Sequence, residues 1–383
     1  MSSRRPLIAL LLPLLLASCG DAGSAAEGSG EGPAIRTPLR LGEGRRSVVV
    51  VSMDTTRADH IGAYGYPLDI TPNVDALAER GVRFANAYAP MPQTLPSHTS
   101  LFTGMWPRQH GTLENVFSVN PAVVTMAEVF GDLGYRTGSV IGALALHNES
   151  GIDAGFDFWD QPGGDWEMDI KHPAEQPANV VTDKALGWAD GLSADEPFFL
   201  FAHYYDPHGP FEAPPKHLKA VPVEPVLEFV KQKKLARELA GLPKQLTNQH
   251  LAATWHGYAA ELRFTDAQVG RLLNGLAERG LMEDTVVVLV GDHGEGLYEH
   301  GQKAHGVAVW EEMHRIPMIF AHPEGLAAGQ VVDQRVSLRD VMPSLFSMAT
   351  DTVQGVNEDL NRSLDLWQLV LAGEALPERP IFL

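Results

Sequence analysis

Aspartate and histidine side chains gather at three places in the chain, each directly after an apolar run. Asp54 follows the β-branched run SVVVVSM, and Asp292 follows the similar run TVVVLVG. A third polar segment, HYYDPHGP, ends the apolar run that starts at Pro197. Continuous β-branched runs predict buried parallel strands. Because ligands of parallel sheets bind at the carboxyl ends of the strands, we expect a site rich in Asp and His at one edge of a sheet.

The chemistry that suits these side chains is metal binding or acid–base catalysis. Carboxylates and imidazoles at strand ends bind divalent cations such as Zn, Mn, Ca or Mg. A single Asp at a strand end is usually a helix cap or a turn residue, so no one position decides the matter. Together the set is hard to explain without such chemistry. Its members are Asp54, Thr94, His110, Asp206, His208, Asp292, His293, His300 and His305.

The elements that must position this set alternate between strands and helices. Hydrophobic periodicity predicts strands at 47–53, 138–142, 197–205, 285–291 and 316–320, and helices at 71–81, 123–133, 252–279 and 337–349. This alternation predicts an α/β domain with a mostly parallel central sheet and helices on both faces. The stretch 214–249 has mixed charge and several prolines, and we interpret it as a helical insertion over the active face.

The composition limits the classes of partner. The chain has 383 residues, of which 44% are hydrophobic and 20% charged, as is usual for globular proteins. Its formal net charge is −19, and it contains no run of clustered Lys and Arg. Because so acidic a chain gains little from phosphate contacts, we expect no nucleic-acid partner.

The first 45 residues differ from the rest. Residues 1–19 combine Arg4 and Arg5, an apolar run and small residues, which is typical of a secretory signal. The end of this segment, LASC, resembles a bacterial lipobox, which implies lipidation of Cys19; the alternative is an ordinary cleaved signal. Residues 20–45 are rich in Gly, Ser, Ala and Glu and predict a flexible tether. We therefore expect an exported protein, lipid-anchored to the bacterial envelope on the periplasmic side or the cell surface.

Six segments resemble the sulfatase family, within the alkaline-phosphatase-like superfamily, over nearly all of residues 46–383. They are VVVVSMDTTRADHIGAYGYP, ITPNVDALAERGVRFANAYA, TLPSHTSLFTGMWPRQHG, DPHGPF, YAAELRFTDAQVGRLL and GDHGEGLYEHGQKAHG. The resemblance implies an alkaline-phosphatase/sulfatase-like catalytic domain at 46–376. Residues 377–383 resemble the start of the family's C-terminal subdomain, which we expect to be shortened or missing here. The implied metal ligands are Asp54, Thr94, Asp292 and His293, and the implied catalytic residues are Thr94, His98, His208, Lys303 and His305.

The segment QTLPSHTSLFTG departs from the family at its most important position. Where sulfatases have a Cys, or sometimes a Ser, that is oxidised to formylglycine, this chain has Thr94; His98 replaces an arginine. We therefore expect no formylglycine, and instead a threonine hydroxyl activated by a metal ion. Pro96 suits the first turn of a helix, which would place Thr94 at the positive end of that helix, where an anionic ester binds well. The alternative is that Thr94 only caps the helix.

These residues favour a metal-dependent hydrolase of anionic esters. A threonine ester cannot collapse to an aldehyde as a formylglycine hydrate does, so phosphate or phosphonate esters are more suitable substrates than sulfate esters. Two alternatives remain. The same chemistry could transfer a phospho-substituent to an envelope lipid or glycan, or the chain could be a non-catalytic lipoprotein that binds an anionic glycan. Metal analysis separates the last of these from an enzyme.

The number of metal ions is left open by the sequence. Asp206, His208 and His305 would suit a second ion, since a carboxylate with two imidazoles is a common transition-metal set. In the alternative, one ion is bound, His208 and His305 hold substrate oxygens, and Lys303 or His98 adds positive charge.

The lipobox generates a direct test. We expect Cys19→Ala to abolish incorporation of radiolabelled palmitate into the protein expressed in bacteria, because the sulfur that carries the lipid is removed. Labelling that persists in the variant would contradict lipidation at Cys19.

Overall fold

The computed structural model describes residues 45–163, 175–232, 248–301, 303–350, 363–377 and 380–381. The predicted signal peptide, the lipobox with Cys19 and all of the predicted tether except Arg45 lie outside these residues. So do residues 233–247 of the predicted insertion and most of the segment 377–383.

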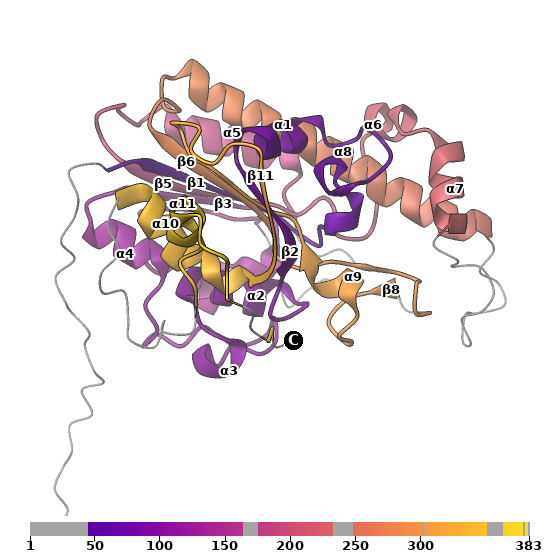
Figure 1. The fold of residues 1–383 in the computed structure, drawn as a ribbon, viewed down its shortest axis with the longest axis horizontal. Coiled ribbons are helices and arrows are strands. Elements are labelled where there is room, and N and C mark those ends of the chain that lie inside the picture. The colour runs from indigo at the N-terminus through magenta and orange to yellow at the C-terminus, as the bar shows by residue number, and fades with distance from the viewer. Residues whose placement is uncertain are drawn as a thin grey trace, which may run out of the picture. The chain divides into compact units, whose positions relative to one another are not determined.

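A nine-stranded sheet forms the centre of the domain, with strand β1 (Ser47–Met53) in its middle (Figure 1). β1 pairs in parallel with β5 (Phe198–Tyr204) on one side and β6 (Thr285–Gly291) on the other. Beyond β5 lie the parallel strands β3 (Arg136–Ile141) and β4 (Phe158–Asp160). Beyond β6, β10 (Met318–Ala321) is antiparallel to its neighbours β6 and β2 (Val82–Tyr88), and β11 (Gln330–Ser337) is parallel to β2. The predicted α/β class with a mostly parallel sheet is therefore confirmed.

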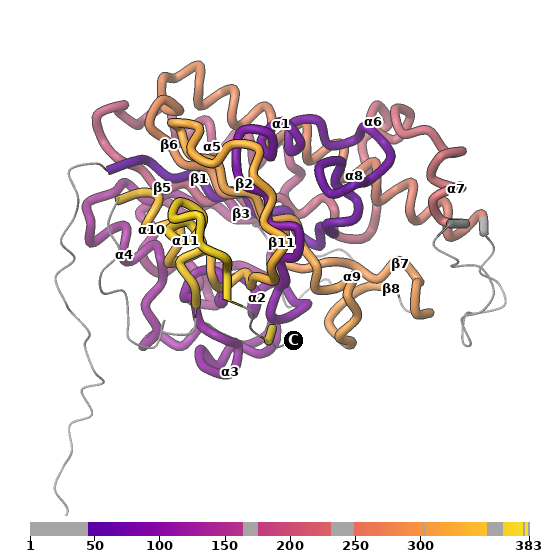
Figure 2. The backbone as a smooth tube through the Cα atoms, in the orientation of Figure 1, coloured from indigo at the N-terminus to yellow at the C-terminus, as the bar shows by residue number. Residues whose placement is uncertain are grey.

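Helices cover both faces of this sheet (Figures 1 and 2), because side chains of a strand alternate between its two faces. Val49 and Val51 of β1 belong to one buried core, and Val48 and Val50 belong to the other. The first core includes side chains of α1 (Pro72–Arg80), α5 (Ala178–Ala189) and α8 (Asn248–Glu278). The second includes side chains of α2 (Thr94–Thr103), α4 (Met126–Asp132), α10 (Val341–Thr350) and α11 (Leu366–Ala372).

The smaller elements lie in the connections. The predicted insertion contains α6 (Pro215–Ala220) and α7 (Val223–Gln232), which both pack on α8. Short helices α3 (Pro107–His110) and α9 (Glu311–His314) and a two-stranded ribbon of β7 (Gly296–Leu297) and β8 (Lys303–Ala304) lie in loops. Single 3₁₀ turns occur at Ala58–His60, Gly62–Tyr64, Leu144–Leu146, Asn148–Ser150 and Leu338–Asp340.

Three differences from the predicted elements have local causes. The strand expected at 316–320 is divided at Pro317, which has no N–H for the ladder, into β9 (Arg315–Ile316) and β10. The helix expected from residue 123 begins at 126, because Thr125 and Glu128 form a capping box there. Strand β11 was not predicted, since its edge position leaves most of its side chains exposed and removes the apolar pattern.

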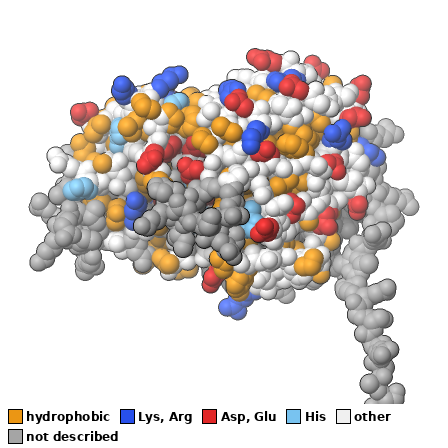
Figure 3. All heavy atoms as spheres, turned by 180° about the vertical axis from the view of Figure 1, so that it is seen from behind, with side chains coloured by type: hydrophobic (Ala, Val, Ile, Leu, Met, Phe, Trp, Pro, Cys, Tyr) orange, Lys and Arg blue, Asp and Glu red, His pale blue; other side chains and the backbone are white. Residues whose placement is uncertain are grey.

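The surface of the described residues is mixed in charge. Figure 3 shows acidic and basic side chains interspersed on one face, without an extended basic surface on its described part. None of the helices within the described ranges has both the length and the apolar character that crossing a lipid bilayer requires.

The contact between residue 155 and α4 generates a stability prediction. Gly155 has a φ of +92°, and a Cβ there would stand 2.1 Å from the backbone nitrogen of Glu128. Gly111 has a similar φ of +82° with no atom within 4 Å of a Cβ. We expect Gly155→Ala to lower the free energy of unfolding by more than about 3 kcal/mol, because backbone strain of about 1–3 kcal/mol adds to the clash. Gly111→Ala should show the strain alone in urea titrations followed by circular dichroism, and equal losses would contradict this account.

Candidate metal and catalytic site

Asp54 lies at the centre of the site because β1 lies between the two strands that supply its neighbours. Met53, the last residue of β1, pairs with Tyr204 of β5 and with Gly291 of β6. His203 therefore approaches from one side, and the residues after Gly291 approach from the other. Asp54 Oδ2 lies 3.3 Å from His203 Nε2, and Asp54 Oδ1 lies 3.9 Å from His293 Nε2. All three side chains are completely buried.

Asp292 and His293 supply the other half of the cluster. Asp292 Oδ1 accepts hydrogen bonds from the backbone N–H groups of Thr55 at 3.0 Å and His293 at 2.7 Å. Asp292 Oδ2 lies 3.4 Å from His293 Nε2. His293 Nδ1 lies 2.9 Å from the Gly294 carbonyl and donates to it, so the lone pair of Nε2 faces the two carboxylates. This tautomer suits a metal ligand.

Thr94 is the first residue of α2, at the positive end of the helix, where Pro96 predicted it. Its Oγ1 lies 3.5 Å from His293 Nε2. The residue in the N-cap position is Gln93, and the Leu95 N–H donates to Asn115 Oδ1 at 2.9 Å, so the helix start is capped from another loop. This arrangement disfavours the alternative that Thr94 serves only as a cap.

His98 lies one turn further along α2 and holds Thr94 in place. Its Nδ1 donates to the Thr94 carbonyl at 2.7 Å, and its Nε2 accepts from the Ser52 hydroxyl at 2.9 Å. Burial, followed by the charge of His203, lowers the pKa of His98 well below its usual range, so the imidazole is neutral. The geometry favours a positioning role for His98 over the positive charge that the one-metal alternative assigns to Lys303 or His98.

The polar atoms of this cluster fit a divalent cation. Both oxygens of Asp54, Oδ2 of Asp292 and both ring nitrogens of His203 are buried without a hydrogen-bond partner. Burial raises the pKa of Asp54 to about 7 although the charge of His305 opposes the rise. Burial, followed by the charge of Asp54, raises the pKa of Asp292 well above its usual range. A bound cation would offset these costs by favouring both charged carboxylates.

Two sets of three side chains in the described part of the chain could hold such an ion. They are Asp54, Asp292 and His293, and His98, His203 and Asp292. The first set is the better donor set, because both nitrogens of His98 already have hydrogen-bond partners. It contains three of the four predicted ligands, and the fourth, Thr94, lies beside it.

The remaining polar groups lie on the loop that follows β6, whose two ends are joined by backbone hydrogen bonds. The Gly294 N–H donates to the Met313 carbonyl at 2.8 Å, and the Glu295 N–H donates to the Glu312 carbonyl at 3.1 Å. These two backbone hydrogen bonds, which we call the loop neck, hold together the two ends of the segment 296–311. In Figure 1 this segment, which contains β8 and leads into α9, extends beside the sheet.

His305 comes from this loop and lies next to the candidate metal set. Its ring lies 4.4 Å from the ring of His293 and 5.0 Å from that of His208. Its Nδ1 lies 3.5 Å from Glu295 Oε1. Burial lowers the pKa of His305, but the carboxylates of Glu295, Asp54 and Asp292 together outweigh burial, so that the pKa is raised. His305 is therefore the one of these imidazoles that is suited to carry a proton.

His208 and Lys303 are the other two residues that the sequence predicted to be catalytic. His208 stacks on Tyr205, its Nδ1 donates to the Gly209 carbonyl at 2.7 Å, and burial lowers its pKa to about 4. Lys303 is exposed, with its Nζ 5.8 Å from the centre of the Phe211 ring. These positions are compatible with substrate contacts, which stay a prediction.

Asp206, His110 and His300 have local partners. Asp206 Oδ1 accepts from the Ala178 N–H at 3.1 Å, at the start of α5. His110 is paired with the Ser100 hydroxyl at 2.9 Å, and the ring of His300 stacks on that of Trp310 at 3.9 Å. Neither candidate metal set includes Asp206, His208 or His305, so a second metal ion stays a prediction.

Two residues of the site were not predicted. His203 lies inside the apolar strand PFFLFAHYY, and its signal was a lone imidazole at the carboxyl end of a buried strand. Glu295 lies in the segment GDHGE, where the sequence gives no indication that its carboxylate would pair with His305, ten residues further on.

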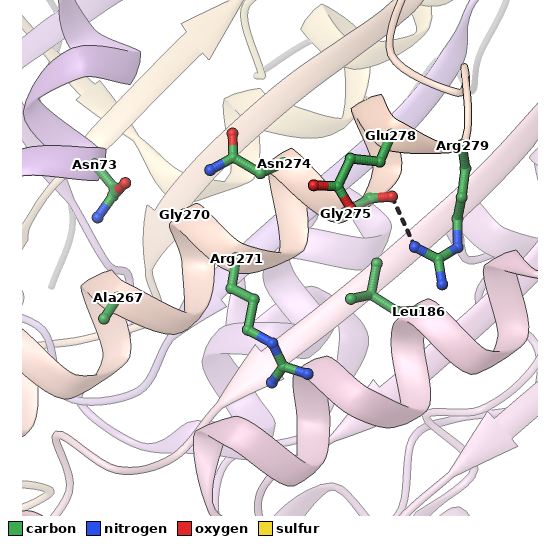
Figure 4. Close-up of a pocket in the computed structure, with 9 residues that line it drawn as sticks. All are labelled: Asn73, Leu186, Ala267, Gly270, Arg271, Asn274, Gly275, Glu278 and Arg279. Atoms are coloured by element: carbon green, nitrogen blue, oxygen red, sulfur yellow. Dashed lines mark hydrogen bonds between the residues drawn. The ribbon is translucent and has the colours of Figure 1, made fainter.

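A separate hollow of about 550 Å³ lies between α5 and α8 (Figure 4). Its lining includes Gly270 and Gly275, where a Cβ would lie 2.2 Å from Asn73 Oδ1 and 2.7 Å from Leu186 Cδ2, so that glycine allows these neighbours to pack closely against α8. Arg279 donates to the Gly275 carbonyl at 2.8 Å and is ion-paired with Asp190 at 2.8 Å. None of the candidate site residues lines this hollow, so it belongs to helix packing and not to the chemistry.

A cation site and an adjacent hydroxyl at a helix N-terminus, on this sheet, form the kind of centre with which α/β enzymes cleave anionic esters. The sulfatase family model matches residues 46–351, and the chain belongs to the sulfatase family, whose members generally bind a divalent metal. It is 29% identical over 348 residues to the uncharacterized sulfatase YidJ of Escherichia coli K12, covering 80% of this chain and 68% of the relative. The protein is thus a sulfatase-family ester hydrolase with an anionic ester as substrate.

Two solved structures share the fold. One was determined in complex with its substrate D-glucosamine-2-N,6-O-disulfate and has a TM-score of 0.71 at 23% identity, covering 87% of this chain and 81% of that protein. The other is the phosphonate monoester hydrolase of Agrobacterium radiobacter, with a TM-score of 0.64 at 20% identity, covering 79% of this chain and 73% of that protein.

Glu261 of α8 provides a test of the electrostatics on this side of the sheet. Only 5% of the residue is exposed, and burial, followed by the charge of Asp206, raises the pKa of Glu261 to about 8. Because the folded state holds this proton more tightly than the unfolded state, its contribution to stability is complete below about pH 4 and is lost as the pH rises toward 8. We expect Glu261→Gln to be nearly neutral at pH 5 and stabilising by about 1–3 kcal/mol at pH 8.5.

Chemical unfolding at the two pH values measures this difference. Glu114→Gln, at an exposed position, is the control and should show no such dependence on pH. The same effect of Glu261→Gln at both pH values would contradict the raised pKa.

Proposed function

We propose that this protein is a metal-dependent hydrolase that uses Thr94 as its nucleophile. The observation that carries the proposal is the position of Thr94 Oγ1, at the positive end of α2 and 3.5 Å from His293 Nε2 of the candidate metal set. His98 and Asn115 hold the first turn of α2 through Thr94 and Leu95. The hydroxyl is thereby held beside the buried carboxylates before a substrate arrives.

The reaction follows from the residues around this hydroxyl. A divalent cation held by Asp54, Asp292 and His293 would favour transfer of the Thr94 proton to water and would offset charge on the ester oxygens. Thr94 Oγ1 then forms a bond to the phosphorus or sulfur atom while the bond to the leaving oxygen breaks. The backbone N–H groups at the start of α2 favour the anionic group that is transferred. Water cleaves the resulting threonine ester and restores the hydroxyl.

His305 is the proposed general acid. The Glu295 carboxylate raises its pKa, and its ring lies against that of His293. A protonated His305 can therefore donate a proton to the leaving oxygen, and a neutral His305 can accept one from the attacking water. His208, at 5.0 Å from His305, and the exposed Lys303 are proposed to bind oxygens of the substrate.

The substrate that we propose is a phosphate or phosphonate ester. Threonine has a single hydroxyl and releases its ester only by attack of a second nucleophile, a route that phosphoryl transfer accommodates well. The likeness in fold to a phosphonate monoester hydrolase supports this choice, whereas the protein solved with D-glucosamine-2-N,6-O-disulfate supports a sulfate ester. We further propose that the enzyme is held at the bacterial envelope through lipid on Cys19.

Substitution of Thr94 tests the proposed nucleophile. We expect Thr94→Ala to lower kcat by at least about 10³-fold with an unchanged circular dichroism spectrum, because the group that forms the covalent bond is lost. Thr94→Ser should retain measurable turnover. The substrates are matched 4-nitrophenyl esters of sulfate, phosphate, a phosphodiester and a phosphonate.

The screen and the variants answer different questions. A preference for the sulfate ester in the wild type would contradict the proposed substrate but leave the nucleophile standing. Near-normal turnover of Thr94→Ala on any ester that the wild type cleaves would exclude Thr94.

A further inference from the structure

We propose that Tyr258 is a positioning residue that sets the affinity of the site for its metal ion. Tyr258 lies on α8, about 200 positions along the chain from Asp54, and is completely buried. Its hydroxyl donates to the Thr55 carbonyl at 2.8 Å and accepts from the Arg57 N–H at 2.9 Å. One phenol oxygen therefore holds both ends of the turn that follows the metal ligand Asp54.

The first of these bonds reaches the candidate metal set through Thr55. Thr55 has a φ of +48°, in the left-handed region that β-branched residues rarely adopt. In this conformation its N–H donates to Asp292 Oδ1 at 3.0 Å while its carbonyl accepts from Tyr258. Because the N–H groups of Thr55 and His293 both donate to Oδ1 of Asp292, its Oδ2 is left facing His293. Tyr258 thus holds one of the two donors that set the direction of a carboxylate that it does not touch.

The second bond joins the two loops that carry the ligands. The Arg57 side chain is buried, and its Nη1 donates to the Glu295 carbonyl at 3.1 Å. Its Nε and Nη2 donate to the two carboxylate oxygens of Asp59 at 2.9 Å each, and Nη1 also pairs with Glu299. The loop after β1 is thereby fastened to the loop after β6, and Tyr258 holds the backbone of the arginine that makes the connection.

The ring of Tyr258 makes contacts that do not need its hydroxyl. It packs against His60 at 5.0 Å and Phe211 at 5.4 Å between ring centres. Tyr258→Phe keeps these contacts and removes only the hydrogen bonds to Thr55 and Arg57. The substitution therefore separates positioning of the ligands from packing of α8.

Metal titration of the purified protein tests the proposal. Zn²⁺, Mn²⁺, Ca²⁺ and Mg²⁺ are each titrated by calorimetry into metal-free wild type, and the ion that binds most tightly is used for the variants. We expect Tyr258→Phe to weaken binding of that ion about 10–100-fold, as loss of groups that orient metal ligands typically does. Asp54→Ala should abolish binding and marks the limit of the effect.

Tyr135→Phe is the matched control. The hydroxyl of this buried tyrosine also donates to a backbone carbonyl, that of Arg46 at 3.0 Å. This bond lies at the amino ends of β1 and β3, whereas the candidate site lies at the carboxyl ends of the strands. Tyr135→Phe should lower the melting temperature of the metal-free protein about as much as Tyr258→Phe does, while leaving the metal affinity unchanged. This comparison removes any effect of general destabilisation.

The outcomes are distinct. Unchanged affinity in Tyr258→Phe, or an equal loss in both tyrosine variants, overturns the proposal, and so does a wild type that binds none of the four ions. Metal binding that depends on Tyr258 in a protein that cleaves no ester would support the proposal and count against the proposed function alone.

Discussion

Two buried carboxylates, those of Asp54 and Asp292, lie side by side at the carboxyl ends of the strands. Their mutual repulsion has to be offset by the groups that surround them. Neither carboxylate reaches water, and burial raises the pKa of each. Such a pair is stable in its charged form only with a cation or with many donors nearby. The Thr55 and His293 N–H groups satisfy one oxygen of Asp292, and the remaining oxygens face His203, His293 and the start of α2.

The sheet brings the two carboxylates together by its strand order. β1 and β6 are adjacent and parallel, and they are in register, so the residues that follow them emerge at the same level. β5 on the other side of β1 adds His203. The two apolar cores then fix this register, because a slip of one residue would move Val48 and Val50 from one core into the other. Packing energy far from the site therefore maintains the spacing of its charged groups.

The parts that the sequence predicted well are those with a local cause. β1 and β6 were predicted with the observed bounds, since a continuous β-branched run can hardly form anything else in a globular domain, and both lead directly into an aspartate. Thr94 was placed at a helix start by Pro96 alone. β11 was not predicted, because an exposed edge strand loses the apolar pattern on which such predictions depend. The roles of His203, Glu295 and Tyr258 could not be predicted either, since each depends on partners that only the fold brings near.

The loop neck has a consequence for how such an enzyme diversifies. The hydrogen bonds from Gly294 to Met313 and from Glu295 to Glu312 close the segment 296–311 where it leaves the metal ligands. Changes of length within the segment can leave these two hydrogen bonds, and with them the backbone next to Asp292 and His293, in place. His305 lies inside the same segment and is paired with Glu295 at its base, so only those changes that return His305 to this position preserve the proposed reaction centre.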